Sequence, residues 1–182
     1  MVKVMNKVFG KKTDFAPIKE DASRVIISYG YQEVDKENAT WYEIYLYKKQ
    51  VNQVSLADVK AAIIADINKR TDEKILSGFE YTPDGTETSV KVWLSSENQF
   101  NFKAAFDLAI QTEGATLPVT FKLGETEDGT PVYHEFATIM ALQAFYSGAV
   151  AYINQALAEG WQGKDNIDWS QYETFFPVTE NQ

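Results

Sequence analysis

The sequence predicts an α+β fold in which repeated strand-strand-helix units form an antiparallel sheet with helices packed on one face. Pairs of runs rich in Val, Ile and Tyr precede three stretches of helical periodicity. Each unit ends at a glycine, and turn residues separate the paired runs. The units recur about every 40 residues, but their unequal loops and different side chains favour one α+β domain over a solenoid.

The first unit combines a hairpin with an amphipathic helix. Residues 24–31 and 39–49 read as its strands. Ser55 and Asp58 form a capping-box variant at the helix start, and Gly78 follows the helix end. The apolar helix face consists of Leu56, Val59, Ile63 and Ile67, and the expected solvent face of Lys60, Asp66, Lys69, Arg70 and Glu73.

The second unit has predicted strands at 79–82 and 88–94 around the turn Pro83-Asp84-Gly85. Its helix starts in WLSSENQFNF, residues 93–102, and ends before Gly114. Ser96 with Gln99 predicts a capping box, and Ser95 with Asn98 a second pairing. Phe100 falls on the charged side of this helix, so it either folds over the first turn or is exposed to a partner.

The third unit has predicted strands at 117–123 and 131–136 around Glu127-Asp128-Gly129. Residues 138–158 carry no Asp, Glu, Lys or Arg, yet are too polar for a membrane span, and the helix is expected to stop at Gly160. One helix face suits packing on a sheet. The opposite face is small and uncharged, which predicts a cover formed by a terminal segment of the chain or by another subunit; it includes Met140, Ala144, Ser147, Gly148 and Ala151.

Charge and aromatic content divide the chain into four segments. Residues 1–20 form a basic N-terminal arm, 21–78 an N-terminal strand-strand-helix lobe, and 79–160 the main α+β domain. Residues 161–182 form an aromatic C-terminal tail, expected to dock on the domain or on a neighbour.

Aromatic residues on the first hairpin predict a second contact surface. Alternation places Trp41, Tyr45 and Tyr47 on one strand face, while the other face is also apolar. One face packs in the core, and the other is an inter-lobe contact or an interface. The predicted interface residues are Tyr45, Tyr47, Phe100, Met140, Ala144, Ser147, Gly148, Ala151, Trp161 and Trp169.

Composition argues against several functional classes. The net charge of −9 disfavours nucleic acid and anionic membranes as partners, and the N-terminus lacks the apolar segment of a signal peptide. The chain has no cysteine and one histidine, so we expect no cofactor, no metal site and no catalytic residues. His134 lies in an alternating run and reads as a hydrogen-bonded strand residue, with a catalytic or metal role as the alternative.

Residues 74–160 resemble an uncharacterised domain family of tailed phages and prophages, including those of gut Bacteroidales, found near tail-fibre genes. The likeness rests on WLSSENQFNF, on Leu117-Pro-Val-Thr-Phe-Lys122 and on the helix after His134. Residues 8–15 and 28–31 also look similar to gut-phage relatives. The resemblance implies a virion tail protein made in the bacterial host cytoplasm, and it brings no catalytic residues.

The first functional hypothesis is a structural virion protein of the tail, baseplate or fibre attachment. It would bind other phage tail proteins, form a homo-oligomer, and use the basic arm to reach a neighbouring subunit. The alternative is a tail-fibre assembly factor, a chaperone absent from mature virions. A carboxylate-based glycan-cleaving enzyme is the third hypothesis, with Glu97 as a test position, and the aromatic surface would also suit a host glycan.

Overall fold

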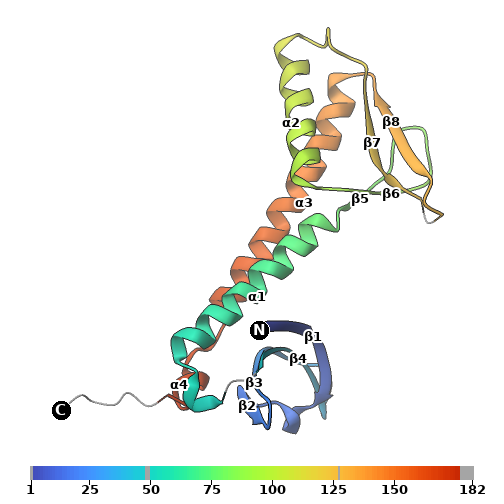
Figure 1. Ribbon diagram of the computed structural model, residues 1–182. Coiled ribbons are helices and arrows are strands. Elements are labelled where there is room, and N and C mark those ends of the chain that lie inside the picture. Colours follow the sequence, from blue (N-terminus) through green and yellow to red (C-terminus); the bar gives the residue numbers. More distant parts are fainter. Residues whose placement is uncertain (1, 48–49, 127, 177–182) are drawn as a thin grey trace. The chain divides into compact units, whose positions relative to one another are not determined.

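The computed structural model describes residues 2–47, 50–126 and 128–176, with side chains from Lys7 onward (Figure 1). Its eight strands and four α-helices, with antiparallel pairing throughout, confirm the α+β class. The chain divides into two compact units: unit 1 is Met1–Arg70 with Gly160–Gln182, and unit 2 is Thr71–Glu159. Predicted features at Lys48, Lys49, Glu127 and 177–182 lie outside the described residues.

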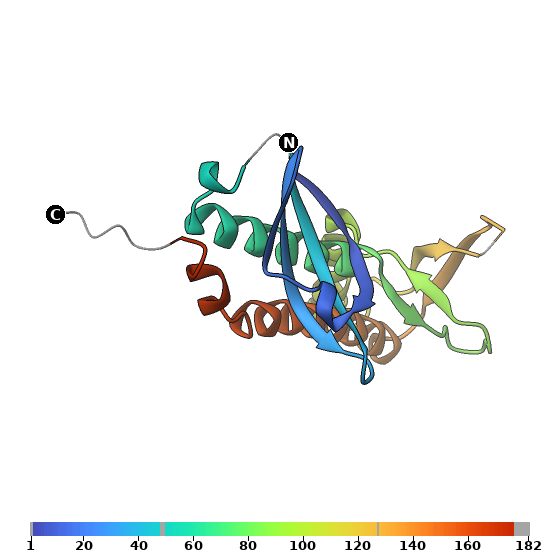
Figure 2. The same ribbon diagram turned by 90° about the horizontal axis from the view of Figure 1, so that it is seen from below.

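Unit 1 contains one antiparallel sheet, drawn in blue in Figure 2. Its strand order is β1-β4-β3-β2. The strands are β1 (Val2–Lys11), β2 (Ile18–Asp21), β3 (Arg24–Glu33) and β4 (Asn38–Tyr47). Short 3-10 turns, η1 (Lys12–Asp14) and η2 (Val51–Gln53), follow β1 and β4.

The N-terminal segment differs from the predicted basic arm, because β1 pairs along β4 with Val8 opposite Trp41. The sequence of β1 alternates valine and lysine at Val2-Lys3-Val4, which is typical of a strand with one polar face. Lysines are also common on edge strands, where they discourage pairing with other chains. The structure therefore replaces the predicted arm with an edge strand and with β2.

The core of unit 1 lies between one sheet face and helices α1 (Leu56–Leu76) and α4 (Ser170–Glu173). Ser55 caps α1 as predicted, since the Asp58 N–H donates to its hydroxyl at 3.2 Å. Tyr172 of α4 is fully buried and donates its hydroxyl to the Ser28 carbonyl oxygen at 2.7 Å. The aromatic C-terminal segment thus docks on its own domain, which was one of the two predicted outcomes.

Asp66 corrects the predicted solvent face of α1, because its side chain is only 1% exposed. It accepts hydrogen bonds from the Tyr29 hydroxyl and, at 2.7 Å, from Arg70 Nε. Asp66 lies three residues after Ile63 and therefore shares the buried face of the helix. Its polarity obscured that position in the sequence.

Unit 2 contains two hairpins and the helices packed on them. The hairpins are β5 (Phe79–Tyr81) with β6 (Val90–Val92) and β7 (Val119–Glu125) with β8 (Pro131–Phe136), so the described residues form three separate sheets. The Trp93 N–H joins the hairpins by donating to the Leu123 carbonyl oxygen at 3.0 Å. The helices are α2 (Ser96–Gln111) and α3 (Ile139–Asp165), which lie side by side in Figure 1 and share a stacked Phe106–Tyr146 ring pair.

The prediction that the third helix stops at Gly160 is wrong, because α3 continues to Asp165. A glycine inside a helix costs about 1 kcal/mol relative to alanine, which is a weak stop signal without other terminators. Gly160 is buried, so its small size serves close packing. Gly78 and Gly114, by contrast, adopt φ of 82° and 86° just after α1 and α2 and end those helices as predicted.

An aromatic cluster forms the core of unit 2. Phe145 of α3 is fully buried at its centre. Its ring centroid lies 4.8 Å from that of Phe136, 4.9 Å from that of Phe102 and 5.0 Å from that of Tyr81. The cluster therefore ties both hairpins and α2 to the inner side of α3.

Candidate functional site

The helix α3 presents four different sides within unit 2. Its inner side is buried in the aromatic core through Leu142, Phe145 and Ala149. The other three sides face the C-terminal end of α1, a groove beside α2, and solvent. Their side chains decide where a partner could bind.

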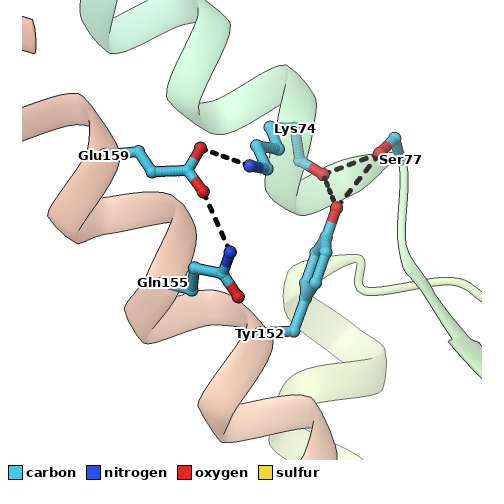
Figure 3. Close-up of polar contacts among 5 residues, drawn as sticks. All are labelled: Lys74, Ser77, Tyr152, Gln155 and Glu159. Carbon is cyan, nitrogen blue, oxygen red and sulfur yellow. Dashed lines mark hydrogen bonds and ion pairs between the residues drawn. The ribbon is translucent and has the colours of Figure 1, made fainter.

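Polar contacts fix the side of α3 that faces the end of α1 (Figure 3). The Tyr152 hydroxyl and the Ser77 hydroxyl both donate to the Lys74 carbonyl oxygen, at 2.8 and 2.7 Å. Lys74 also forms an ion pair with Glu159, which accepts a second hydrogen bond from Gln155 Nε2 at 3.1 Å. Together these donors hold the pKa of Glu159 below its usual value.

These contacts have a structural role. The last carbonyl groups of a helix lack partners inside the helix, and here two hydroxyl groups from outside satisfy one of them. Because the Ser77 hydroxyl is aimed at a carbonyl oxygen, the arrangement gives it no base to activate it as a nucleophile. This side of α3 is therefore committed to holding unit 2 together.

The solvent side of α3 is the one that the sequence singled out. We call Met140, Ala144, Ser147 and Ala151 the outer α3 face; all four are exposed, and Met140 is 80% exposed. Gly148 is half-buried, and a Cβ atom on it would lie 3.5 Å from the Phe79 ring. Within unit 2 the described residues leave the outer α3 face exposed, and its predicted cover by a terminal segment or by another subunit stays a prediction.

A groove of about 280 Å³ runs between α2 and α3. We call it the α2–α3 groove; its wall on α3 is formed by Tyr146, Val150 and Ile153. Phe102 and Leu94 also line it, and the charged residue of the lining, Lys103, forms an ion pair with Asp107. The groove is therefore apolar inside and its charge at the edge is already compensated.

Phe100 also lines the groove, yet 71% of its surface is exposed. Of the two predicted alternatives, the structure therefore shows the exposed aromatic. The predicted pairing of Ser95 with Asn98 is confirmed, because Ser95 caps α2 by accepting from the Asn98 N–H at 3.2 Å. The predicted cap at Ser96 is wrong, since Ser96 is already the first residue of α2, and Gln99 Nε2 donates to the Leu94 carbonyl oxygen at 2.7 Å. Phe100 is the most exposed large apolar side chain of WLSSENQFNF.

The remaining predicted interface residues lie in unit 1. Tyr45 donates its hydroxyl to Glu43 Oε2 at 2.8 Å, and the Trp41 indole donates to Glu43 Oε1 at 2.9 Å. Burial, together with the bond to Glu43, raises the pKa of Tyr45. This sheet face is therefore largely engaged within unit 1.

The other three aromatic residues of that prediction differ in exposure. Tyr47 is half-buried against Tyr45, and Trp169 packs on the unit 1 core. Trp161 is exposed. Of the predicted interface residues in unit 2, Phe100 lies at the α2–α3 groove, and Met140, Ala144, Ser147 and Ala151 form the outer α3 face on another side of the helix.

Sequence reasoning assigned the groove residues Tyr146, Val150 and Ile153 to the packing face of the helix. Their spacing of four and three residues places them along one edge of that face, and this position was the only indication in the sequence that they could line a groove. His134 contacts the rings of Tyr81 and Phe136, with centroids 6.2 and 4.6 Å away. Its hydrogen bonding stays a prediction.

The described residues offer neither a cluster of metal ligands nor a membrane-spanning helix. In residues 2–47, 50–126 and 128–176 no group of three or more His, Asp or Glu side chains is placed to hold a metal ion. Within the same ranges, the helices fall short of the length and apolar character needed to span a bilayer.

The fold and surface define an α+β protein with an uncharged helical face in its second unit. Residues 58–179, about two thirds of the chain, match the family described as a domain of unknown function (DUF4376), and the chain belongs to this family. The match includes all of unit 2 and begins after the four-stranded sheet. Comparisons with curated proteins and with solved structures gave no match.

Proposed function

We propose that the protein is a structural component of a phage virion, in the tail, the baseplate or the fibre attachment, and acts by binding other tail proteins. The observation that carries this proposal is the outer α3 face, which is exposed and uncharged over several helical turns. The phage context rests on the resemblance of WLSSENQFNF and Leu117-Pro-Val-Thr-Phe-Lys122 to tailed-phage proteins.

The composition of the outer α3 face favours a protein partner. The cores of protein interfaces are depleted in charged residues, and the outer α3 face carries none. Met140 and Phe100 are the two most exposed large apolar side chains of the described residues in unit 2. Helix α1 offers the contrast, since its exposed surface carries Lys69, Asp72 and Glu73.

The carboxylates of unit 2 also favour binding over catalysis. Asp107 pairs with Lys103, and Glu159 pairs with Lys74. Glu97, the test position for a glycan-cleaving enzyme, is exposed in the first turn of α2. An acidic side chain there stabilises the helix because it interacts favourably with the helix dipole. An acid catalyst for glycoside cleavage normally occupies a cleft that raises its pKa.

Quantitative mass spectrometry of gradient-purified particles of the encoding phage tests the proposal. We expect a fixed copy number per particle that follows the symmetry of the tail. If the chain is abundant in lysates but absent from particles, the proposal is wrong and the assembly-factor alternative takes its place.

A matched pair of variants links this test to the surface. Ala144→Arg places a charge on the outer α3 face, whereas Ala65→Arg places one on an exposed position of α1. We expect the copy number in particles to fall for Ala144→Arg and to stay unchanged for Ala65→Arg. Equal incorporation of both variants would show that the outer α3 face does not bind the tail.

A further inference from the structure

The surface of unit 2 carries both a projecting aromatic side chain and an apolar groove beside it. Phe100 projects from α2 with 71% of its surface exposed, and it forms one edge of the α2–α3 groove. Exposing a phenyl group next to an apolar groove leaves the surfaces of both in contact with water, which is unfavourable. A contact that buries both at once would therefore be favoured.

The apolar lining of the groove points to an apolar side chain as its occupant. Its volume is about 280 Å³. Sites for drug-sized ligands and cofactors usually measure about 300–1,000 Å³ and contain several converging polar groups. The inner wall here is apolar, formed by Phe102, Tyr146, Val150 and Ile153, and so suits an aromatic ring.

Charge favours a second copy at this location over other parts of the surface. Two chains of net charge −9 repel each other, so they approach best where neither presents uncompensated charge. Residues 139–158 of α3 contain no charged side chain, and Lys103, the charged residue of the groove lining, is paired with Asp107. Insertion of a ring into the groove would therefore bury no unpaired charge of the groove lining, which is the costly event at interfaces.

Twofold symmetry completes the argument. In an isologous dimer the same patch serves both subunits, so a projection and a recess must lie side by side on each copy. Phe100 and the α2–α3 groove meet that requirement. We propose that the chain self-associates through this patch, with Phe100 of each copy inserted into the α2–α3 groove of the other.

This inference deepens the proposed function because it names a second copy of the chain as one partner of unit 2. It rests on the proposed function only in treating unit 2 as the unit that binds other proteins.

Sedimentation equilibrium of the full chain, wild type and variants, over a range of concentrations tests the inference. Phe100→Asp removes the projecting ring. Phe9→Asp is the matched control, because Phe9 is also a highly exposed phenylalanine, at 63%, and lies on β1 of unit 1.

We expect a wild-type dimer and a rise in its dissociation constant of about a hundredfold or more for Phe100→Asp. Truncating a central aromatic residue typically weakens binding by at least about thirtyfold, and a dimer contains two copies. Phe9→Asp should change the constant by less than about threefold, since it lies outside the patch. A monomeric wild type at about millimolar concentration, or equal effects of the two variants, would overturn the inference.

A second measurement uses the absence of cysteine from the sequence. Lys103→Cys at the groove edge and the unit 1 control Lys36→Cys each introduce a single exposed thiol and keep Phe100, and a short bismaleimide can link each thiol to its counterpart in another copy. Covalent dimers should form with Lys103→Cys and stay at background with Lys36→Cys. The same low yield from both variants would contradict the proposed contact.

The two proposals fail separately. A monomeric chain that is present in particles at fixed copy number rejects self-association and leaves the structural role intact. A dimer that depends on Phe100 but is absent from particles rejects the structural role and leaves the self-association site.

Discussion

The two units place their polar groups in opposite ways. Unit 1 buries Ser28, Glu43 and Asp66, which are the buried polar and charged residues of the described chain. Unit 2 has an aromatic core around Phe145. Its outer α3 face is exposed and carries no charged side chain.

Buried polar contacts hold the helix on the sheet in unit 1, whereas unit 2 has an aromatic core and an uncharged exposed surface. In unit 1, Asp66 accepts from Tyr29 and Arg70, and the Arg70 guanidinium lies 3.7 Å from the centre of the Tyr42 ring. Such a network requires one arrangement of α1 on the sheet. In unit 2 the core consists of apolar and aromatic side chains, and the outer α3 face is exposed.

The strongest way to sharpen the comparison is to remove the centre of the aromatic core. Phe145→Ala deletes a fully buried ring, and we expect the free energy of unfolding of unit 2 to fall by about 3–5 kcal/mol. Urea unfolding followed by hydrogen exchange in residues 79–159 measures the change. A loss below about 1 kcal/mol would show that the cluster does not hold unit 2 together.

The next largest effect should come from the buried carboxylate of unit 1. Asp66→Ala leaves the Tyr29 hydroxyl and the Arg70 guanidinium without their common acceptor, at an expected cost of about 2–4 kcal/mol in unfolding free energy. The control Asp72→Ala removes an exposed carboxylate of the same helix and should cost less than about 0.5 kcal/mol. Similar values for the two variants would contradict the polar role assigned to Asp66.

Alkaline pH should destabilise unit 1. Burial is the main cause that raises the pKa values of Tyr29 and Tyr172 above the ordinary value near 10. Above about pH 10 the unfolded chain therefore releases these protons while the folded unit keeps them, so stability is complete below that pH and falls as pH rises. Each tyrosine contributes a slope of about 1.4 kcal/mol per pH unit.

The variant Tyr172→Phe tests this slope, because it removes one titrating hydroxyl and its hydrogen bond to Ser28. We expect a cost of about 1 kcal/mol at pH 7 and a shallower decline of the unfolding midpoint between pH 10 and 11.5. An unchanged decline would mean that Tyr172 ionises equally in both states.

The smallest effect on stability should come from charges on the outer α3 face. The double variant Ala144→Arg and Ala151→Arg alters two exposed positions, so the free energy of unfolding should change by less than about 0.5 kcal/mol. Incorporation into particles should nevertheless be lost, as measured by mass spectrometry, while the dimer formed through Phe100 and the α2–α3 groove should persist in sedimentation. If the fold and the incorporation both survive, this face is simply solvated.

Much of the local structure could be predicted because it is encoded by short-range chemistry. Pro83-Asp84-Gly85 marked a hairpin turn, Ser55 and Asp58 marked a helix start, and Leu56 to Ile67 marked a buried face. Each depends on residues within one turn or one strand pair. The outer α3 face could be predicted for the same reason.

Features that depend on tertiary placement could not be predicted in this way. The lysines of residues 1–20 predicted a basic arm, because the sequence does not show that β4 is available as a partner strand for β1. Asp66 was predicted to be solvent-exposed because the two groups that donate hydrogen bonds to it come from β3 and from the next helical turn. The α2–α3 groove exists only once two helices far apart in sequence lie together.

The central claim is that the outer α3 face is covered when the protein is assembled. Ala144→Cys and the α1 control Ala61→Cys give single exposed thiols, whose maleimide labelling rates can be compared in the purified chain at micromolar concentration and in gradient-purified particles. The account predicts similar rates in dilute solution and at least about tenfold slower labelling of Ala144→Cys in particles. Equal labelling of both positions in particles would contradict it.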